Sequence, residues 1–157
     1  MSGDFFKMAL LCVLGALLIV AAITDLRSRI ISNRLNLIIA ALAPVWWIAC
    51  GLPLWPGVAA QLLVGLVVFA LFAALFAAGM MGGGDVKLLG ALALWFPWQA
   101  MLSLIVLMAL LGGLVTLVTL LHHRWAKRPG QPEIPYGVAS SIAALWLIGE
   151  RYLNHFA

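Results

Sequence analysis

Charged residues are scarce in this chain of 157 residues. Nine Lys or Arg and five Asp or Glu make up 9% of the sequence, whereas about a quarter of a soluble domain is charged. Hydrophobic residues make up 66%. This composition excludes a water-soluble single domain, and also a disordered chain, which combines low hydrophobicity with high net charge. No nucleic-acid partner is expected, because the net charge of +4 comes from few residues and no basic stripe alternates with aromatic side chains.

Residues that build metal sites and disulfides are also few. Cys12 and Cys50 both lie in apolar stretches and form no CxxC pair, so neither a zinc site nor a disulfide framework is expected. His122 and His123 are adjacent, which places them on different faces of a helix, and no HExxH pattern occurs. We therefore expect no metal and no cofactor.

Long apolar runs fill most of the chain and predict a single all-α domain over residues 1–157, embedded in the lipid bilayer. A helix of about 20 apolar residues crosses a hydrocarbon core of about 30 Å. The sequence predicts about six such transmembrane helices, at residues 5–24, 35–50, 58–78, 88–95, 99–121 and 136–153. A five-span alternative makes the short fourth stretch re-entrant. The first run also resembles a signal peptide, but we expect it to be retained because the chain stays apolar to its end.

The basic residues set the predicted orientation. Seven of the nine would lie on one side of a six-span protein, where short cytoplasmic loops concentrate Lys and Arg. These seven are Arg27, Arg29, Arg34, Lys87, Arg124, Lys127 and Arg128. We therefore expect a multi-pass protein of the inner (plasma) membrane with both termini away from the cytoplasm.

Two of the five acids are candidates for function. Asp25 closes the first predicted span and Asp85 opens the fourth, so both should emerge on the cytoplasmic side at similar depth. Ionisable groups at membrane depth are costly and are functional candidates by default. The alternatives are that Asp25 pairs with Arg27 or Arg29 as a loop residue, and that Asp85 caps the fourth helix.

Three glycines precede the second of these aspartates. Gly82, Gly83 and Gly84 cost backbone entropy at a helix start, and a close approach by an extended substrate strand would explain them. Two carboxylates about 3 Å apart do not both ionise. The ionised one can then activate a water for attack on a peptide carbonyl, while the protonated one polarises that carbonyl. This chemistry requires no metal or cofactor.

These strings resemble one known family. Residues 82–89, Gly-Gly-Gly-Asp-Val-Lys-Leu-Leu, are similar to the GxGD motif of the type IV prepilin peptidases, which are intramembrane aspartyl proteases. Presenilin-type proteases share GxGD, but the continuation into Val-Lys-Leu is more like the prepilin peptidases. Residues 24–33 and 134–139 resemble the family's first aspartate segment and its proline-aromatic-glycine segment.

The resemblance implies a function. Asp25 and Asp85 would be the catalytic pair that removes the short basic leader of type IV pilin-like precursors at the cytoplasmic membrane face. Gly82, Gly83, Gly84 and Lys87 would contact this substrate.

Two features differ from the usual family pattern. Ser32 stands where a proline is usual, and the link at residues 25–34 lacks the cysteine-bearing insertion of larger members. The chain therefore resembles the small, peptidase-only branch of tight-adherence pilus and preflagellin peptidases, and methyltransferase activity is not expected. The alternatives are a small proton- or cation-coupled transporter and a structural pilus-assembly subunit.

Overall fold

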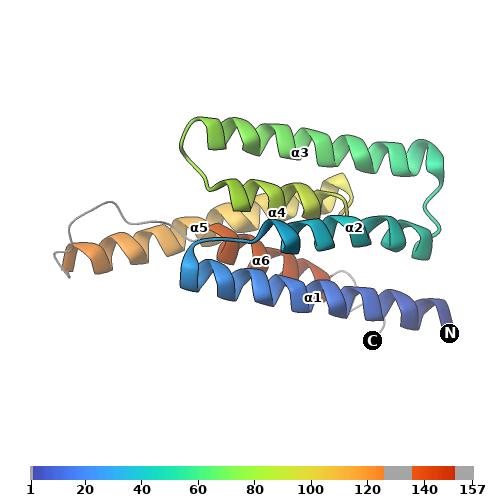
Figure 1. Ribbon diagram of the computed structural model, residues 1–157, viewed down its shortest axis with the longest axis horizontal. Helices are drawn as coiled ribbons and strands as arrows, with labels where there is room; N and C mark the ends of the chain where they lie inside the picture. The colour runs from blue at the N-terminus through green and yellow to red at the C-terminus, as the bar shows by residue number, and fades with distance from the viewer. Residues whose placement is uncertain (1, 126–135, 151–157) are drawn as a thin grey trace.

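Helices make up almost all of the computed structural model, which describes residues 2–125 and 136–150. They are α1 (Ser2–Ser28), α2 (Asn33–Ala49), the short turn η1 (Leu54–Val58), α3 (Ala59–Ala77), α4 (Gly83–Ala93), α5 (Trp98–Trp125) and α6 (Tyr136–Ile148) (Figure 1). The described part contains no strand. The all-α prediction is confirmed.

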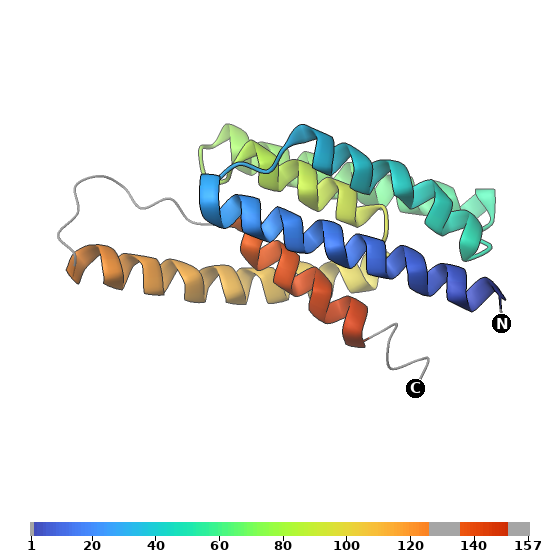
Figure 2. The ribbon, with the colours of Figure 1, turned by 60° about the horizontal axis from the view of Figure 1, so that its bottom comes forward.

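The shortest α-helix, α4, lies at the centre of the bundle. It packs against α2, α3 and α6, and α6 in turn packs against α1 and α5. Two views of the ribbon show that the C-termini of α1 and α3 and the N-termini of α2, α4 and α6 lie at one end of the bundle (Figures 1 and 2). Residues far apart in sequence therefore meet at this end, which we call the gathered end.

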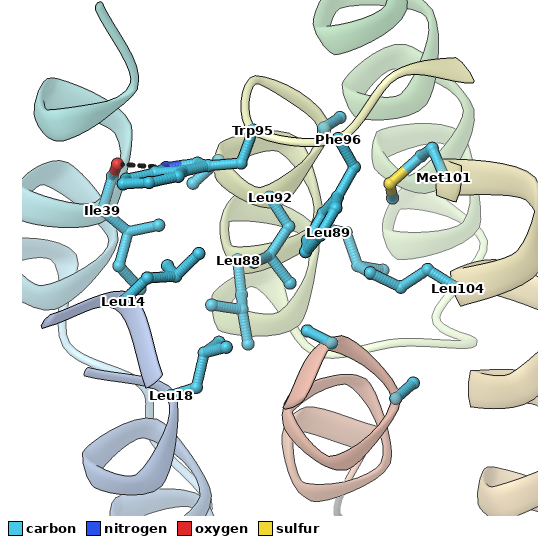
Figure 3. Close-up of a cluster of buried hydrophobic side chains, with 14 of the residues drawn as sticks. Leu14, Leu18, Ile39, Leu88, Leu89, Leu92, Trp95, Phe96, Met101 and Leu104 are labelled. Atoms are coloured by element: carbon cyan, nitrogen blue, oxygen red, sulfur yellow. Dashed lines mark hydrogen bonds between the residues drawn. The ribbon is translucent and has the colours of Figure 1, made fainter. Parts of the chain in front are cut away.

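Buried apolar side chains surround α4 (Figure 3). Leu88, Leu89 and Leu92 of α4 are fully buried. Around them lie equally buried side chains from α1, α2, α5 and the turn after α4: Leu14, Leu18, Ile39, Phe96, Met101 and Leu104. Deleting one such side chain typically costs about 2–5 kcal/mol, so this cluster holds the position of α4.

Side chains from neighbouring helices bind the carbonyl groups at and after the C-terminus of α4. The Gln61 side-chain amide donates to the carbonyl oxygens of Ala93 and Phe96, at 2.7 and 2.6 Å. The Trp47 indole N–H donates to the Leu94 carbonyl at 2.7 Å. The last carbonyls of a helix lack partners within the helix, and here α2 and α3 supply them.

Three helical segments are long and apolar enough to cross a membrane: Gly3–Ser28, Leu54–Ala77 and Trp98–Val118. Asn33–Ala49 and Tyr136–Ile148 are shorter apolar helices, and α4 is shorter still, with 11 residues. The count of six spans and the placement of the termini stay predictions.

Several predicted boundaries differ from the structure. The first helix continues through Asp25 to Ser28, α4 begins inside the expected glycine-rich break, and α5 continues to Trp125 through the start of the expected polar loop. In each case the helix continues past the apolar run through polar residues or glycines, and for α4 burial against its neighbours outweighs the weak helix propensity of glycine. The rest of that loop and the end of the sixth run lie outside the described residues.

Candidate active site

Asp25 is buried near the C-terminus of α1, with 4% of its surface exposed. Its carboxylate oxygen Oδ2 accepts a hydrogen bond from the backbone N–H of Val138, at 3.0 Å. Val138 lies in the first turn of α6, where free N–H groups and the helix dipole favour a negative charge. Asp25 is therefore fixed by a backbone group that lies 113 residues later in the chain. The structure describes no ion pair of Asp25 with Arg27 or Arg29; within the described residues the one salt bridge joins Lys7 and Asp4.

Asp85 lies in the first turn of α4 and is 7% exposed. One of its carboxylate oxygens, Oδ1, is buried without a hydrogen-bond partner among the described residues. Buried polar atoms almost always have partners. An unpaired one in a cavity is therefore a group that a ligand can bind.

The two carboxylates converge on Gly137, in the first turn of α6. A Cβ built on Gly137 would lie 2.9 Å from Oδ2 of Asp25 and 2.9 Å from Oδ1 of Asp85. The two oxygens are thus at most twice that distance apart. The structure thus brings together the two aspartates that the sequence singled out, and their common depth in the membrane stays a prediction.

A cavity of about 240 Å³ opens beside the pair. Its lining comes from the end of α1, the link to α2 and the start of α4: Asp25, Arg29, Ile30, Ile31, Gly82, Gly83, Gly84 and Asp85. Arg29 has a left-handed backbone conformation, with φ of 56°, which is uncommon for a residue with a side chain. It ends α1 and lies in the cavity wall.

Burial controls the protonation of Asp85. This residue precedes the apolar part of α4 and lies outside the three segments that are long enough to cross a membrane. The loss of hydration, with a further contribution from the negative charge of Asp25, raises the pKa of its carboxyl to about 7. Near neutral pH, a large share of Asp85 is thus in the protonated form, which can donate a proton.

The structure gives the three glycines internal contacts. A Cβ on Gly84 would lie 3.3 Å from the backbone N and O of Ile31, and one on Gly83 would lie 3.2 Å from the Phe76 ring. The chain's own α1–α2 link therefore approaches Gly84 closely. All three glycines also line the cavity, so the expected substrate contact stays a prediction.

Lys87 points to a different place from the carboxylate pair. Its Nζ donates to the side-chain oxygen of Asn33 at 2.7 Å, and Lys87 is absent from the cavity lining. It borders a larger open groove of about 680 Å³ between α2, α3 and α4, whose lining is almost entirely apolar. The groove is larger than the carboxylate cavity, but its lining includes no carboxylate.

Metal binding was not expected from the sequence. Among the side chains that the structure describes, at residues 3–118 and 136–150, no three of His, Cys, Asp or Glu come together. Ser140 and Ser141 are fully buried in α6, and the Ser140 hydroxyl donates to the Tyr136 carbonyl at 2.9 Å.

Comparison with known sequences identifies the family. The profile of the type IV leader peptidase family matches residues 12–117, which include both Asp25 and Asp85. The chain belongs to this family. A prepilin leader peptidase/N-methyltransferase of Aeromonas hydrophila is 38% identical over 84 residues, 48% of this chain and 27% of that protein. A protein of the same name from Bacillus subtilis (strain 168) is 27% identical over 141 residues, 90% of this chain and 56% of that protein.

The chain thus spans only about a quarter to a half of the length of these relatives. No solved structure matches. The family membership agrees with the resemblance found in the sequence motifs.

Sequence reasoning missed two contributors to the site. Gly137 and the N–H of Val138 belong to a segment that we compared with the family but did not place at the aspartates. The signal was the position of this segment at the start of the last apolar run, which the six-span prediction puts on the same side of the membrane as Asp25 and Asp85.

Proposed function

We propose that this chain is a membrane-embedded aspartyl endopeptidase. It removes the short basic leader of type IV pilin-like precursors at the cytoplasmic face of the inner membrane. The observation that carries the proposal is the convergence of two buried carboxylates on one point beside a cavity. Family membership supports a leader-processing activity, and the similar proteins of Aeromonas hydrophila and Bacillus subtilis are named prepilin leader peptidase/N-methyltransferase.

The surroundings of the two aspartates support different roles for them. Asp25 accepts the N–H of Val138 at the N-terminus of α6, which favours its ionised form. Asp85 has an unpaired buried oxygen and is more readily protonated. We therefore assign Asp25 as the base and Asp85 as the acid at the start of the reaction.

The reaction follows from these two protonation states. Asp25 takes a proton from a water molecule as the water oxygen bonds to the peptide carbonyl carbon, and Asp85 gives its proton to the carbonyl oxygen. The resulting gem-diol collapses when Asp25 returns its proton to the amide nitrogen and Asp85 takes one back from a hydroxyl. The C–N bond breaks, and both carboxyls regain their starting states.

The position of the pair supports a cytoplasmic site. Arg27, Arg29 and Arg34 lie in or beside the link between α1 and α2 at the gathered end, and Lys87 lies in α4 nearby. Basic residues concentrate on the cytoplasmic side of membrane proteins. The same position disfavours the transporter alternative, whose ion-binding acids would be expected near the bilayer midplane.

The test is cleavage by purified protein in detergent or liposomes. The substrate panel consists of type IV pilin precursors, each with a short basic leader followed by an apolar segment. We expect Asp25→Asn and Asp85→Asn each to lose cleavage by about 10²–10⁴-fold. The control is Asp4→Asn, because Asp4 is the one other aspartate in the chain and is exposed. Normal processing by either site variant would refute the assignment.

A further inference from the structure

We propose that Gly137 is a positioning residue of the carboxylate pair: Asp25 and Asp85 can converge because the first turn of α6 places a backbone without a side chain between them. This inference rests on the proposed function for its catalytic meaning. Its geometric content, that residue 137 sets the approach of the two carboxylates, stands by itself.

The space at Gly137 is filled from three directions. An added Cβ would lie 2.9 Å from an oxygen of each aspartate and 2.5 Å from Cδ1 of Ile31. Contacts of a Cβ below 3.0 Å are essentially never observed, so a methyl group here must displace its neighbours. The Ile31 contact involves the end of a flexible side chain, which can rotate. The carboxylates have less freedom.

Both carboxylates are held where they are. Asp25 is buried and bonded to the Val138 N–H at 3.0 Å, so moving its Oδ2 away from residue 137 strains or breaks that bond. Asp85 is buried, and the backbone of Gly82 interacts with its carboxylate. A methyl group at residue 137 would therefore widen the pair rather than shift it as a unit.

Other glycines in the same interfaces do not carry this constraint. A Cβ on Gly112 of α5 would make an ordinary contact with the Tyr136 ring at 3.4 Å, and one on Gly15 of α1 would contact Leu145 at 3.5 Å. Among the described glycines, only Gly137 has a Cβ position that would meet oxygens of both aspartates. The need for glycine at residue 137 thus comes from the two carboxylates and not from the close packing of helices around α6.

The first measurement is the steady-state kinetics of Gly137→Ala on a cleaved precursor. We expect kcat to fall by about 10²-fold, the typical effect of a 1 Å misplacement of reacting groups. KM should change by less than about threefold, because the lost interaction belongs to the transition state.

The matched control is Gly90→Ala. Its Cβ would also meet a neighbour at 2.9 Å, the Phe69 ring, but between α3 and α4 and away from the aspartates. Gly90→Ala should lower thermal stability and keep kcat. Equal kcat losses in the two variants would overturn the inference in favour of general crowding.

A double variant separates the carboxylates from Ile31. Ile31→Ala removes the atom that lies 2.5 Å from the new methyl group and leaves both carboxylate contacts. Gly137→Ala in the Ile31→Ala background should still lose about 10²-fold in kcat relative to Ile31→Ala alone. Recovery of kcat in the double variant would show that Ile31, and not the pair, requires the glycine.

A measurement without substrate distinguishes failure of this inference from failure of the proposed function. The chain has three aspartates, so carboxyl-¹³C aspartate labelling of an Asp4→Asn protein leaves two signals for an NMR titration. Interacting carboxyls titrate in two separated steps. Few other ionisable groups lie near the pair. Arg29 is the one other charged side chain in the cavity lining, and the Tyr136 ring lies against Gly112 rather than against the carboxylates.

The titration decides the geometric part. We expect the two steps to move closer together in Gly137→Ala, because a wider pair interacts more weakly. An unchanged titration would overturn the positioning role even if the enzyme cleaves precursors. A changed titration in a protein that cleaves no precursor would refute the proposed function and leave the positioning role in place.

Discussion

The two ends of α4 differ in whether the buried polar groups around them have hydrogen-bond partners. At the C-terminal end, Gln61 and Trp47 supply hydrogen bonds to the carbonyls of residues 93, 94 and 96. At the N-terminal end, Oδ1 of Asp85 and Oδ1 of Asn36 are buried without partners among the described residues. Satisfied groups stabilise a fold, whereas unsatisfied ones cost stability and persist where function needs them. The C-terminal end therefore fixes the position of α4, whereas the N-terminal end keeps unpaired polar atoms, as the proposed active site would require.

The largest expected effect comes from Asp85→Asn, which should act in opposite directions on activity and stability. It should remove cleavage, as proposed above, and raise the melting temperature at pH 7 and higher. The folded-state pKa of Asp85 is about 7, against an ordinary value of 3.8. Ionisation of Asp85 therefore destabilises the fold increasingly as pH rises from 3.8 to about 7, and the neutral amide avoids that penalty. Thermal unfolding in detergent from pH 5 to 8 measures this effect.

The control for that comparison is the wild type at pH 5, where Asp85 is mostly protonated. The stability gain from Asp85→Asn should be smaller there than at pH 8. A variant that is less stable than wild type at pH 8 would show that the N-terminal end of α4 carries no such penalty.

The next effect concerns the other end of α4, where removal of a polar group should only destabilise. Gln61→Leu keeps the approximate shape and leaves two carbonyls, of Ala93 and Phe96, without their donor. An unsatisfied buried group costs about 1–3 kcal/mol, so the melting temperature should fall while kcat of the folded protein is kept. Gln99→Leu is the matched control, because Gln99 is exposed on α5 and should change neither quantity. A large loss of kcat in Gln61→Leu would contradict the division between the two ends.

The pH dependence of cleavage should be an intermediate effect. The proposed acid, Asp85, must be protonated, so the rate should fall as pH rises through about 7. Single-turnover cleavage between pH 5 and 9 measures this limb. A rate that stays constant up to pH 9 would exclude Asp85 as the acid.

Lys87 should give the smallest effect. Its hydrogen bond to Asn33 is exposed, and a polar interaction at an exposed site contributes about 0–1 kcal/mol. Lys87→Met should therefore change stability little, and any effect on KM measures the predicted contact with substrate. A rise in KM of tenfold or more would place Lys87 in substrate binding, whereas an unchanged KM would make it a tie between α4 and α2.

The features of this site that the sequence predicts are those that a local sequence pattern indicates. The apolar runs predict the helices, and the positions of Asp25 and Asp85 at the ends of two runs predict a common face. The start of α4 was placed too late, because three glycines read as a break while packing of α4 against its neighbours extends the helix through Gly83. The contact of Asp25 with Val138 joins residues 113 positions apart, and no local pattern encodes it.

The bond from Val138 to Asp25 has a consequence for mutational scanning. The donor is a main-chain N–H, which every amino acid except proline possesses. An alanine scan would therefore report only the lost packing of the Val138 side chain and would miss the group that holds Asp25. A scan that includes proline would detect the loss of this hydrogen bond. Proline at residue 138 is therefore the substitution that tests this hydrogen bond, because it removes the backbone N–H that Asp25 accepts.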